Sequence, residues 1–157
     1  MSKEYDVAVV GATGAVGEVM ISVLEERNFP VRNLYPLASS RSAGKTIQFR
    51  GKSIRVTDLA EFDFSQAQIG LFSAGGSISA EYAPKAAAAG CVVIDNTSHF
   101  RRDDDIPLIV PEVNADAVAG FTKKHIIANP NCSTAQMVVA LKPLHDKATI
   151  KRVVVAT

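Results

Sequence analysis

Short apolar runs alternate with segments of helical periodicity along this chain. Residues 5–10 are apolar and rich in valine, and after a glycine-rich turn apolar side chains recur at helical spacing between residues 19 and 24. A second apolar run at residues 34–38 completes a strand–helix–strand unit, whose two strands we expect to be parallel. The pattern therefore predicts that the chain opens with a βαβ unit.

The same alternation continues through the rest of the chain. Residues 46–56 alternate around a glycine and predict a small hairpin. An alanine-rich helix is expected over residues 79–89, confined or kinked by Pro84 and stopped by Gly90. Further strands are predicted at residues 69–72, 92–95, 108–110, 126–128 and 151–157. Elements in this order predict an open, doubly wound, Rossmann-like α/β domain with a mostly parallel sheet.

Composition narrows the class of protein. The 157 residues are 47% hydrophobic and 21% charged, which excludes disorder and fits a single domain. Seventeen Lys and Arg against sixteen Asp and Glu leave no broad basic field for nucleic acid or an anionic membrane. No apolar run approaches the roughly 20 residues that span a bilayer, and residues 1–4 are polar, unlike a signal peptide. We therefore expect a cytoplasmic protein without nucleic-acid or membrane partners.

The first candidate for chemistry is the glycine turn after the first strand. Gly11 permits a tight turn, Gly14 lets the backbone approach a pyrophosphate, and Gly17 allows the helix to pack on the strand. This Gly-x-x-Gly-x-x-Gly spacing is a variant of the dinucleotide fingerprint. The alternative is a strand-to-helix turn that needs glycine for its shape alone.

The end of the second strand bears on cofactor choice. NAD-selective sites carry Asp or Glu there, to accept hydrogen bonds from the ribose hydroxyls. This chain has Ser39, Ser40, Arg41 and Ser42 instead. A cation among hydroxyl groups suits a 2′-phosphate and favours NADP, unless Arg41 is only a solvated surface residue.

Cys132 is the second candidate. Residues 129–134 supply turn and N-cap residues for a helix that we expect to continue until Pro143. At such a helix start, unpaired N–H groups and the positive end of the dipole favour a thiolate nucleophile. The alternative is an inert, small apolar residue, which is our expectation for Cys91 between Gly90 and a strand. Two cysteines without C-x-x-C spacing indicate no disulfide framework and, with three histidines, no metal site.

A long polar loop follows the strand at residues 92–95. In it Arg101 could clamp a carboxylate or phosphate, whereas we expect Arg102 to belong to a solvated charge cluster with the acidic residues 103–105. No histidine has a spacing that ties it to Cys132. The three are expected at the surface or in caps: His99, His125 and His145.

Five motifs together resemble a known family. The chain is similar over its whole length to bacterial-type aspartate-semialdehyde dehydrogenases. The motifs are GATGAVG at residues 11–17, SRSAGK at 40–45, DNTS at 95–98 with Phe100 and Arg101, VPEVN at 110–114 and NPNCST at 129–134. The resemblance implies NADPH-dependent reduction of 4-aspartyl phosphate to aspartate 4-semialdehyde and phosphate, on the path to diaminopimelate, lysine, threonine and methionine.

The resemblance also implies roles for single residues. Cys132 would be the nucleophile that forms an acyl thioester, Arg101 a ligand of phosphate or carboxylate, and Asn131 a neighbour of the reacting carbonyl. The implied cofactor contacts are Gly11, Thr13, Gly14, Ala15 and Val16 at the pyrophosphate, with Arg41 and Ser42 at the 2′-phosphate.

Length is where the chain departs from the family. Members are about twice as long, with a second domain for substrate and dimerisation. We expect residues 1–157 to be the NADP-binding domain that carries the nucleophile, with the acid/base and further substrate ligands of a homodimeric parent absent, and so to be inactive alone. Two alternatives are N-acetyl-γ-glutamyl-phosphate reductase, disfavoured by Asn131 before Cys132, and a non-catalytic NADP-binding module, which has no need of Cys132 at a helix start.

Overall fold

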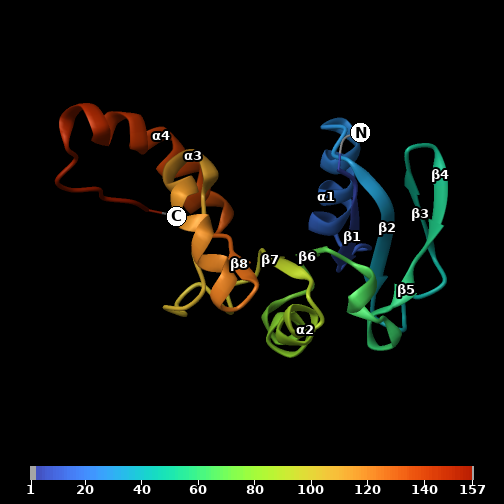
Figure 1. Cartoon of the computed structure of the whole chain (residues 1–157). Coiled ribbons are helices and arrows are strands. Elements are labelled where there is room, and N and C mark those ends of the chain that lie inside the picture. Colours follow the sequence, from blue (N-terminus) through green and yellow to red (C-terminus); the bar gives the residue numbers. More distant parts are fainter. Residues whose placement is uncertain (1–2, 157) are drawn as a thin grey trace.

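A six-stranded sheet in which every pairing is parallel forms the centre of the molecule (Figure 1). The computed structural model describes residues 3–156. The strands, in their order across the sheet, are β5 (Thr57–Asp58), β2 (Val31–Ala38), β1 (Tyr5–Val10), β6 (Ile69–Phe72), β7 (Val92–Asp95) and β8 (Ile126–Ala128). The chain order reverses between β1 and β6, which is the doubly wound arrangement predicted from the sequence.

Helices cover both faces of this sheet. Figure 1 shows α1 (Ala15–Glu26) on one side and α2 (Gly76–Ala88) on the other, while α4 (Cys132–Ala148) extends from the end of β8. None of the helices in residues 3–156 is both long and apolar enough to cross a membrane. The smaller elements are the hairpin β3 (Thr46–Phe49) and β4 (Lys52–Arg55), the short helix α3 (Pro111–Asn114) and the 3-10 helices η1 (Leu59–Glu61), η2 (Phe64–Gln66) and η3 (Ala115–Lys123).

Two apolar cores lie on opposite faces of β1. Val7 and Val9 pack on the α1 side, where Ile21 of α1 joins them. Ala8 and Val10 belong to the core on the α2 side. All four β1 side chains are fully buried, because a central parallel strand is covered on both faces. This explains why residues 7–10 form a continuous apolar run instead of an alternating one.

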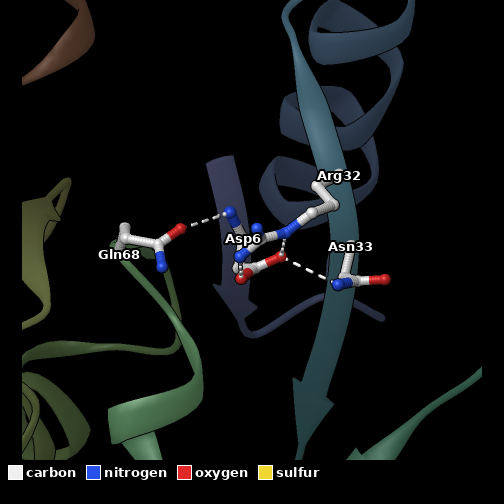
Figure 2. Close-up of polar contacts among 4 residues, drawn as sticks. All are labelled: Asp6, Arg32, Asn33 and Gln68. Atoms are coloured by element: carbon white, nitrogen blue, oxygen red, sulfur yellow. Dashed lines mark hydrogen bonds and ion pairs between the residues drawn. The ribbon is translucent and has the colours of Figure 1, made fainter. Parts of the chain in front are cut away.

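A polar cluster closes the amino-terminal end of the sheet (Figure 2). The carboxylate of Asp6, on β1, accepts hydrogen bonds from Arg32 and Asn33 of β2, and its backbone N–H donates to Gln68 at 2.8 Å. The hydrogen bonds from the Arg32 guanidinium, followed by those from Asn33, lower the Asp6 pKa to about 2, although burial opposes this shift. The cluster ties β1 to β2 and to the segment before β6.

Two of the predicted strands are wrong. Residues 151–156 form no strand, and Val153, Val154 and Val155 are exposed, because no strand of the described chain lies beside them; Thr157, like Met1 and Ser2 of the polar start, lies outside the described residues. Residues 108–110 make only an isolated bridge, from Leu108 to Ala128. An apolar run needs a partner strand before it becomes part of a sheet.

Neither Pro84 nor Pro143 ends a helix, so the predicted end of α4 at Pro143 and the confinement of α2 by Pro84 are wrong. Helix α4 continues past Pro143 to Ala148, and α2 runs through Pro84 from Gly76, three residues before the predicted start. Both prolines are exposed, so water can solvate the carbonyl that each leaves without an N–H partner. Gly90, with φ of +91°, lies just beyond the end of α2 as predicted.

Candidate functional site

The carboxyl ends of the parallel strands bring the predicted site residues to one edge of the sheet. Val10, at the end of β1, pairs with Leu37 of β2 and Phe72 of β6, so these strands end side by side. In open α/β sheets, ligands bind at this edge, where the strand order reverses. The turns that follow the strands are residues 11–14, 39–42, 73–75, 96–101 and 129–131.

The glycine turn has the shape predicted from its spacing. Gly11 has φ of +89°, and a Cβ atom built on it would lie 3.0 Å from the backbone nitrogen of Ala74. A Cβ on Gly17 would lie 2.1 Å from the Gly11 carbonyl oxygen, so only glycine allows α1 to pack this closely on the turn. Gly14 caps α1 without a side-chain hydrogen bond, and this end of the helix is exposed. Its first N–H groups are therefore available to an anion.

A pocket of about 630 Å³ opens beside this turn. Of the predicted cofactor residues, Gly11, Thr13, Gly14 and Arg41 line it. Ala15 and Val16 are the exposed first residues of α1. Ser42 does not line the pocket: its backbone N–H donates to the Ser39 carbonyl at 2.8 Å and closes the turn that presents Arg41.

Sequence reasoning missed several of the residues that line this pocket. They are Asp58, Leu59, Ala60, Ser73, Ala74, Ile78 and Tyr82. Asp58 ends β5, a strand of two residues that is too short to produce a hydrophobic pattern. Small residues after the strand at 69–72 were a signal for Ser73 and Ala74, since such turns at strand ends commonly approach ligands.

Cys132 is exposed and is the first residue of α4, as predicted. Asn131 caps the helix, because its side-chain oxygen accepts the Thr134 N–H at 2.8 Å. Cys132 is thus the first residue of a helix, at the end whose N–H groups have no acceptor within the helix. Cys91 is the opposite case: it is fully buried, and burial raises the pKa of its thiol to about 12.

A second pocket, of about 560 Å³, contains Cys132. Asn96 and Asn129 line it from the ends of β7 and β8, and Gln136 lies one helical turn beyond the cysteine. Residues 109–112, at the start of α3, also line this pocket and include Glu112. Neither Glu112 nor Gln136 was assigned a role from the sequence: Glu112 lies in the motif VPEVN, for which no residue role was implied, and Gln136 belongs to no pattern that separates it from ordinary helix-surface residues.

Arg101 does not line this pocket but is bonded to two residues that do. Its Nε donates to the carbonyl of Asn129 at 2.8 Å, and its Nη2 donates to the carbonyl of Asn96 at 3.1 Å. Both carbonyls belong to residues that line the Cys132 pocket. The loop after β7 thus brings Arg101 to the loop that carries the thiol, 28 residues further along the chain.

The charges next to Arg101 and the histidines do not line either pocket. Asp105 pairs with Lys123 at 2.9 Å, and this contact lowers the Asp105 pKa. The charge cluster expected at residues 102–105 is therefore paired in part with a lysine outside it. Within residues 3–156 no histidine lines either pocket. His145 is 13 residues along α4 from Cys132, a distance of about 20 Å. The described residues also contain no group of three or more His, Cys, Asp or Glu side chains placed to hold a metal.

Comparison with known proteins relates this geometry to a family. The model of the semialdehyde dehydrogenase NAD-binding domain matches residues 6–121. An aspartate-semialdehyde dehydrogenase of Legionella pneumophila is 64% identical over 157 residues, which are 100% of this chain and 45% of that protein. The chain thus spans about half the length of the curated relatives that it matches.

Two solved structures of aspartate-semialdehyde dehydrogenases are also similar to this chain. Aspartate semialdehyde dehydrogenase II of Vibrio cholerae, complexed with ASA, superposes with a TM-score of 0.94 at 63% identity, over 96% of this chain and 49% of that one. The Candida albicans enzyme with NADP has a TM-score of 0.77 at 29% identity, over 94% of this chain and 48% of that one. The chain belongs to the semialdehyde dehydrogenase family, and its residues 6–121 match the NAD-binding domain of that family.

Proposed function

We propose that this chain is the cofactor-binding, thiol-bearing part of an NADP-dependent aspartate-semialdehyde dehydrogenase. The observation that carries the proposal is the position of Cys132, exposed at the start of α4 in a pocket on the same sheet edge as the glycine turn. The relatives named aspartate-semialdehyde dehydrogenase match all of the chain at 61% and 64% identity. The reaction would be reduction of 4-aspartyl phosphate to aspartate 4-semialdehyde with release of phosphate.

The residues around the first pocket fit a nicotinamide dinucleotide. The N–H groups at the start of α1, uncapped by any side chain, suit the pyrophosphate near Thr13 and Gly14. Arg41, in the pocket wall at the end of β2, suits a 2′-phosphate and supports NADP over NAD. The Candida albicans relative was solved with NADP. When bound, the cofactor supplies hydride to the carbonyl carbon of the substrate.

Cys132 would form the covalent intermediate. Its sulfur attacks the carbonyl carbon of the acyl phosphate, an S–C bond forms, and the C–O bond to phosphate breaks. After reduction the S–C bond breaks, which returns the thiolate and releases the aldehyde. The start of α4 stabilises the negative sulfur at both stages.

Arg101 and Asn131 would position the substrate. Arg101 already donates to two backbone carbonyls, and its remaining N–H groups can bind the departing phosphate or the substrate carboxylate. The Asn131 oxygen caps α4, which leaves its amide N–H₂ to donate to the reacting carbonyl.

The 157 residues alone are proposed to be inactive. Collapse of the thiohemiacetal needs a positioned acid/base, a contribution typically worth about 10²–10⁴ in rate. Within residues 3–156, neither pocket is lined by a histidine. The relatives are about twice as long as this chain, which leaves room in them for the acid/base and for the proposed substrate and homodimerisation domain.

A chimera tests the proposal. The 157 residues replace the matching part of the Legionella pneumophila relative, and NADPH formation from semialdehyde, phosphate and NADP is measured. We expect turnover by the chimera, loss of turnover in Cys132→Ala and retention in Cys91→Ala, with none from the 157-residue chain alone. Undiminished turnover in Cys132→Ala would contradict the proposed nucleophile.

A further inference from the structure

Asp95, at the end of β7, has a buried carboxylate that accepts hydrogen bonds from Ser79 and Thr97. The residue is fully buried, and its Oδ1 accepts the Ser79 hydroxyl at 2.8 Å and the Thr97 N–H at 3.1 Å. Its Oδ2 accepts the Thr97 hydroxyl at 2.8 Å. A buried carboxylate is costly unless its oxygens are satisfied, and a satisfied network specifies one arrangement of the groups that make it. Asp95 thus fixes the first turn of α2 and the start of the loop after β7 relative to each other.

The backbone of Asp95 also bonds one of the residues that hold Arg101. The backbone carbonyl of Asp95 accepts the N–H of Asn129 at 2.9 Å, so β7 and the loop before Cys132 are joined at this point. Arg101 then donates to the carbonyl of Asn129 and to the carbonyl of Asn96, the residue after Asp95. Both acceptors of Arg101 therefore belong to residues joined directly to Asp95, Asn96 through the chain and Asn129 through a backbone hydrogen bond.

The loop between Asp95 and Arg101 is shaped by Thr97. Its hydroxyl donates to Asp95 and accepts the backbone N–H of His99 at 3.3 Å, which holds two points of a six-residue connection. Arg101 uses the edge of its guanidinium formed by Nε and Nη2 for the two carbonyls. Within residues 3–156, Nη1 makes no hydrogen bond. The guanidinium is thus held on the carbonyls of two residues that line the Cys132 pocket, although Arg101 itself does not line it.

We propose that Asp95 is a positioning residue that, through Thr97, fixes Arg101 on the carbonyls of Asn96 and Asn129, two residues that line the Cys132 pocket. Asp95 also binds Ser79 of α2, and the adjacent Ile78 lines the pocket beside the glycine turn. One buried carboxylate therefore aligns elements of both pockets. The geometric claim stands on these contacts, whereas its consequence for anion binding by Arg101 rests on the proposed function.

Arginine side-chain NMR of the 157-residue chain tests the geometric claim. The readout is the solvent-exchange rate of the Arg101 Nε–H, with the Arg32 Nε–H, bonded to Asp6 at 2.9 Å at the other end of the sheet, as internal reference. Thr97→Val removes the hydroxyl with little change in shape, and Thr97→Ser retains it. We expect Thr97→Val to accelerate Arg101 exchange about fivefold or more, with Arg32 unchanged and Thr97→Ser within about twofold of the parent.

Ser79→Ala provides a second variant, because it removes a different donor from the same carboxylate. It is expected to accelerate Arg101 exchange in the same direction. Unchanged Arg101 exchange in both variants, or equal acceleration at Arg101 and Arg32, would overturn the proposal. Failure of the proposed function has a different signature: the exchange pattern holds, but the chimera shows no turnover that depends on Cys132. In an active chimera, Thr97→Val is expected to raise KM for phosphate more than it lowers kcat.

Discussion

Arg101 donates its Nε–H to the backbone carbonyl of Asn129, three residues before Cys132, at 2.8 Å. A second bond, from Nη2 to the carbonyl of Asn96, fixes the plane of the guanidinium. A cation held in this way loses little conformational freedom when an anion binds, because its rotamer is already set.

Arg101→Lys is expected to weaken phosphate binding although it conserves the charge. Lysine has one ammonium group, which cannot donate to both carbonyls and also present a planar edge to an anion. In the chimera we expect KM for phosphate to rise about tenfold, with a smaller change in kcat. Arg102→Lys, at the exposed neighbouring position, is the control and should have no effect. Equal KM values for the two variants would remove Arg101 from the anion site.

Arg41→Ala is expected to reduce cofactor discrimination. Arg41 lines the pocket beside the glycine turn, where its charge can bind a 2′-phosphate that NADH lacks. Calorimetry on the 157-residue chain should give about tenfold weaker NADPH binding in the variant, with NADH binding unchanged. Arg27→Ala, at the C-cap of α1, is a matched control outside the pocket. If the parent chain binds both cofactors equally, the argument for NADP fails.

Alkylation by iodoacetamide should distinguish the two cysteines. Cys132 is exposed at the start of α4, whereas burial raises the Cys91 pKa to about 12 from an ordinary value of 9.0. At pH 8 only Cys132 should be labelled, and raising the pH to 10 should still leave Cys91 protected. In urea both thiols should react. Peptide mapping that finds Cys91 labelled first in the folded chain would contradict the assignment.

Asp6 is expected to make stability depend on acid pH. Its pKa is lowered from 3.8 to about 2 in the folded chain, chiefly by Arg32, so its stabilising effect is complete above about pH 4 and is lost as the pH falls towards 2. With allowance for solvent around the half-exposed Arg32, we expect a contribution of about 1 kcal/mol.

Urea titrations of Asp6→Asn and the parent measure this contribution. The difference in unfolding free energy should be largest near pH 6 and should shrink between pH 4 and 2. Asp105→Asn removes an ion pair in which both side chains are exposed and should change stability little at any pH. A difference for Asp6→Asn that does not vary with pH would exclude the proposed linkage.

Strands and turns with strong local signals were predictable. Residues 5–10, 69–72, 92–95 and 126–128 are strands at the predicted bounds, because buried parallel strands are continuous apolar runs. Val153, Val154 and Val155 form a similar apolar run but have no partner strand in the described chain, so the local signal alone was insufficient. Composition identifies a candidate strand, and the sheet around it decides whether it forms.

In the candidate site, too, the features set by local sequence were predictable and the contacts between distant segments were not. The position of Cys132 followed from its Asn131 cap, and the turn at Gly11 followed from glycine spacing, since both are local features. The contact between Arg101 and Asn129 depends on how β7 and β8 lie side by side, and no spacing along the chain contains that information. The same holds for the bond between Ser79 and Asp95, which crosses from a helix to a strand end.

Acyl-enzyme trapping tests the central claim most directly. The chimera is mixed with aspartate semialdehyde and NADP in the absence of phosphate, so that the thioester has no phosphate to accept its acyl group. We expect a burst of one NADPH per Cys132, an aspartyl group on Cys132 by peptide mapping, and release of that group when phosphate is added. A burst without a label on Cys132, or with the label on another residue, would contradict the assignment of Cys132 as the nucleophile.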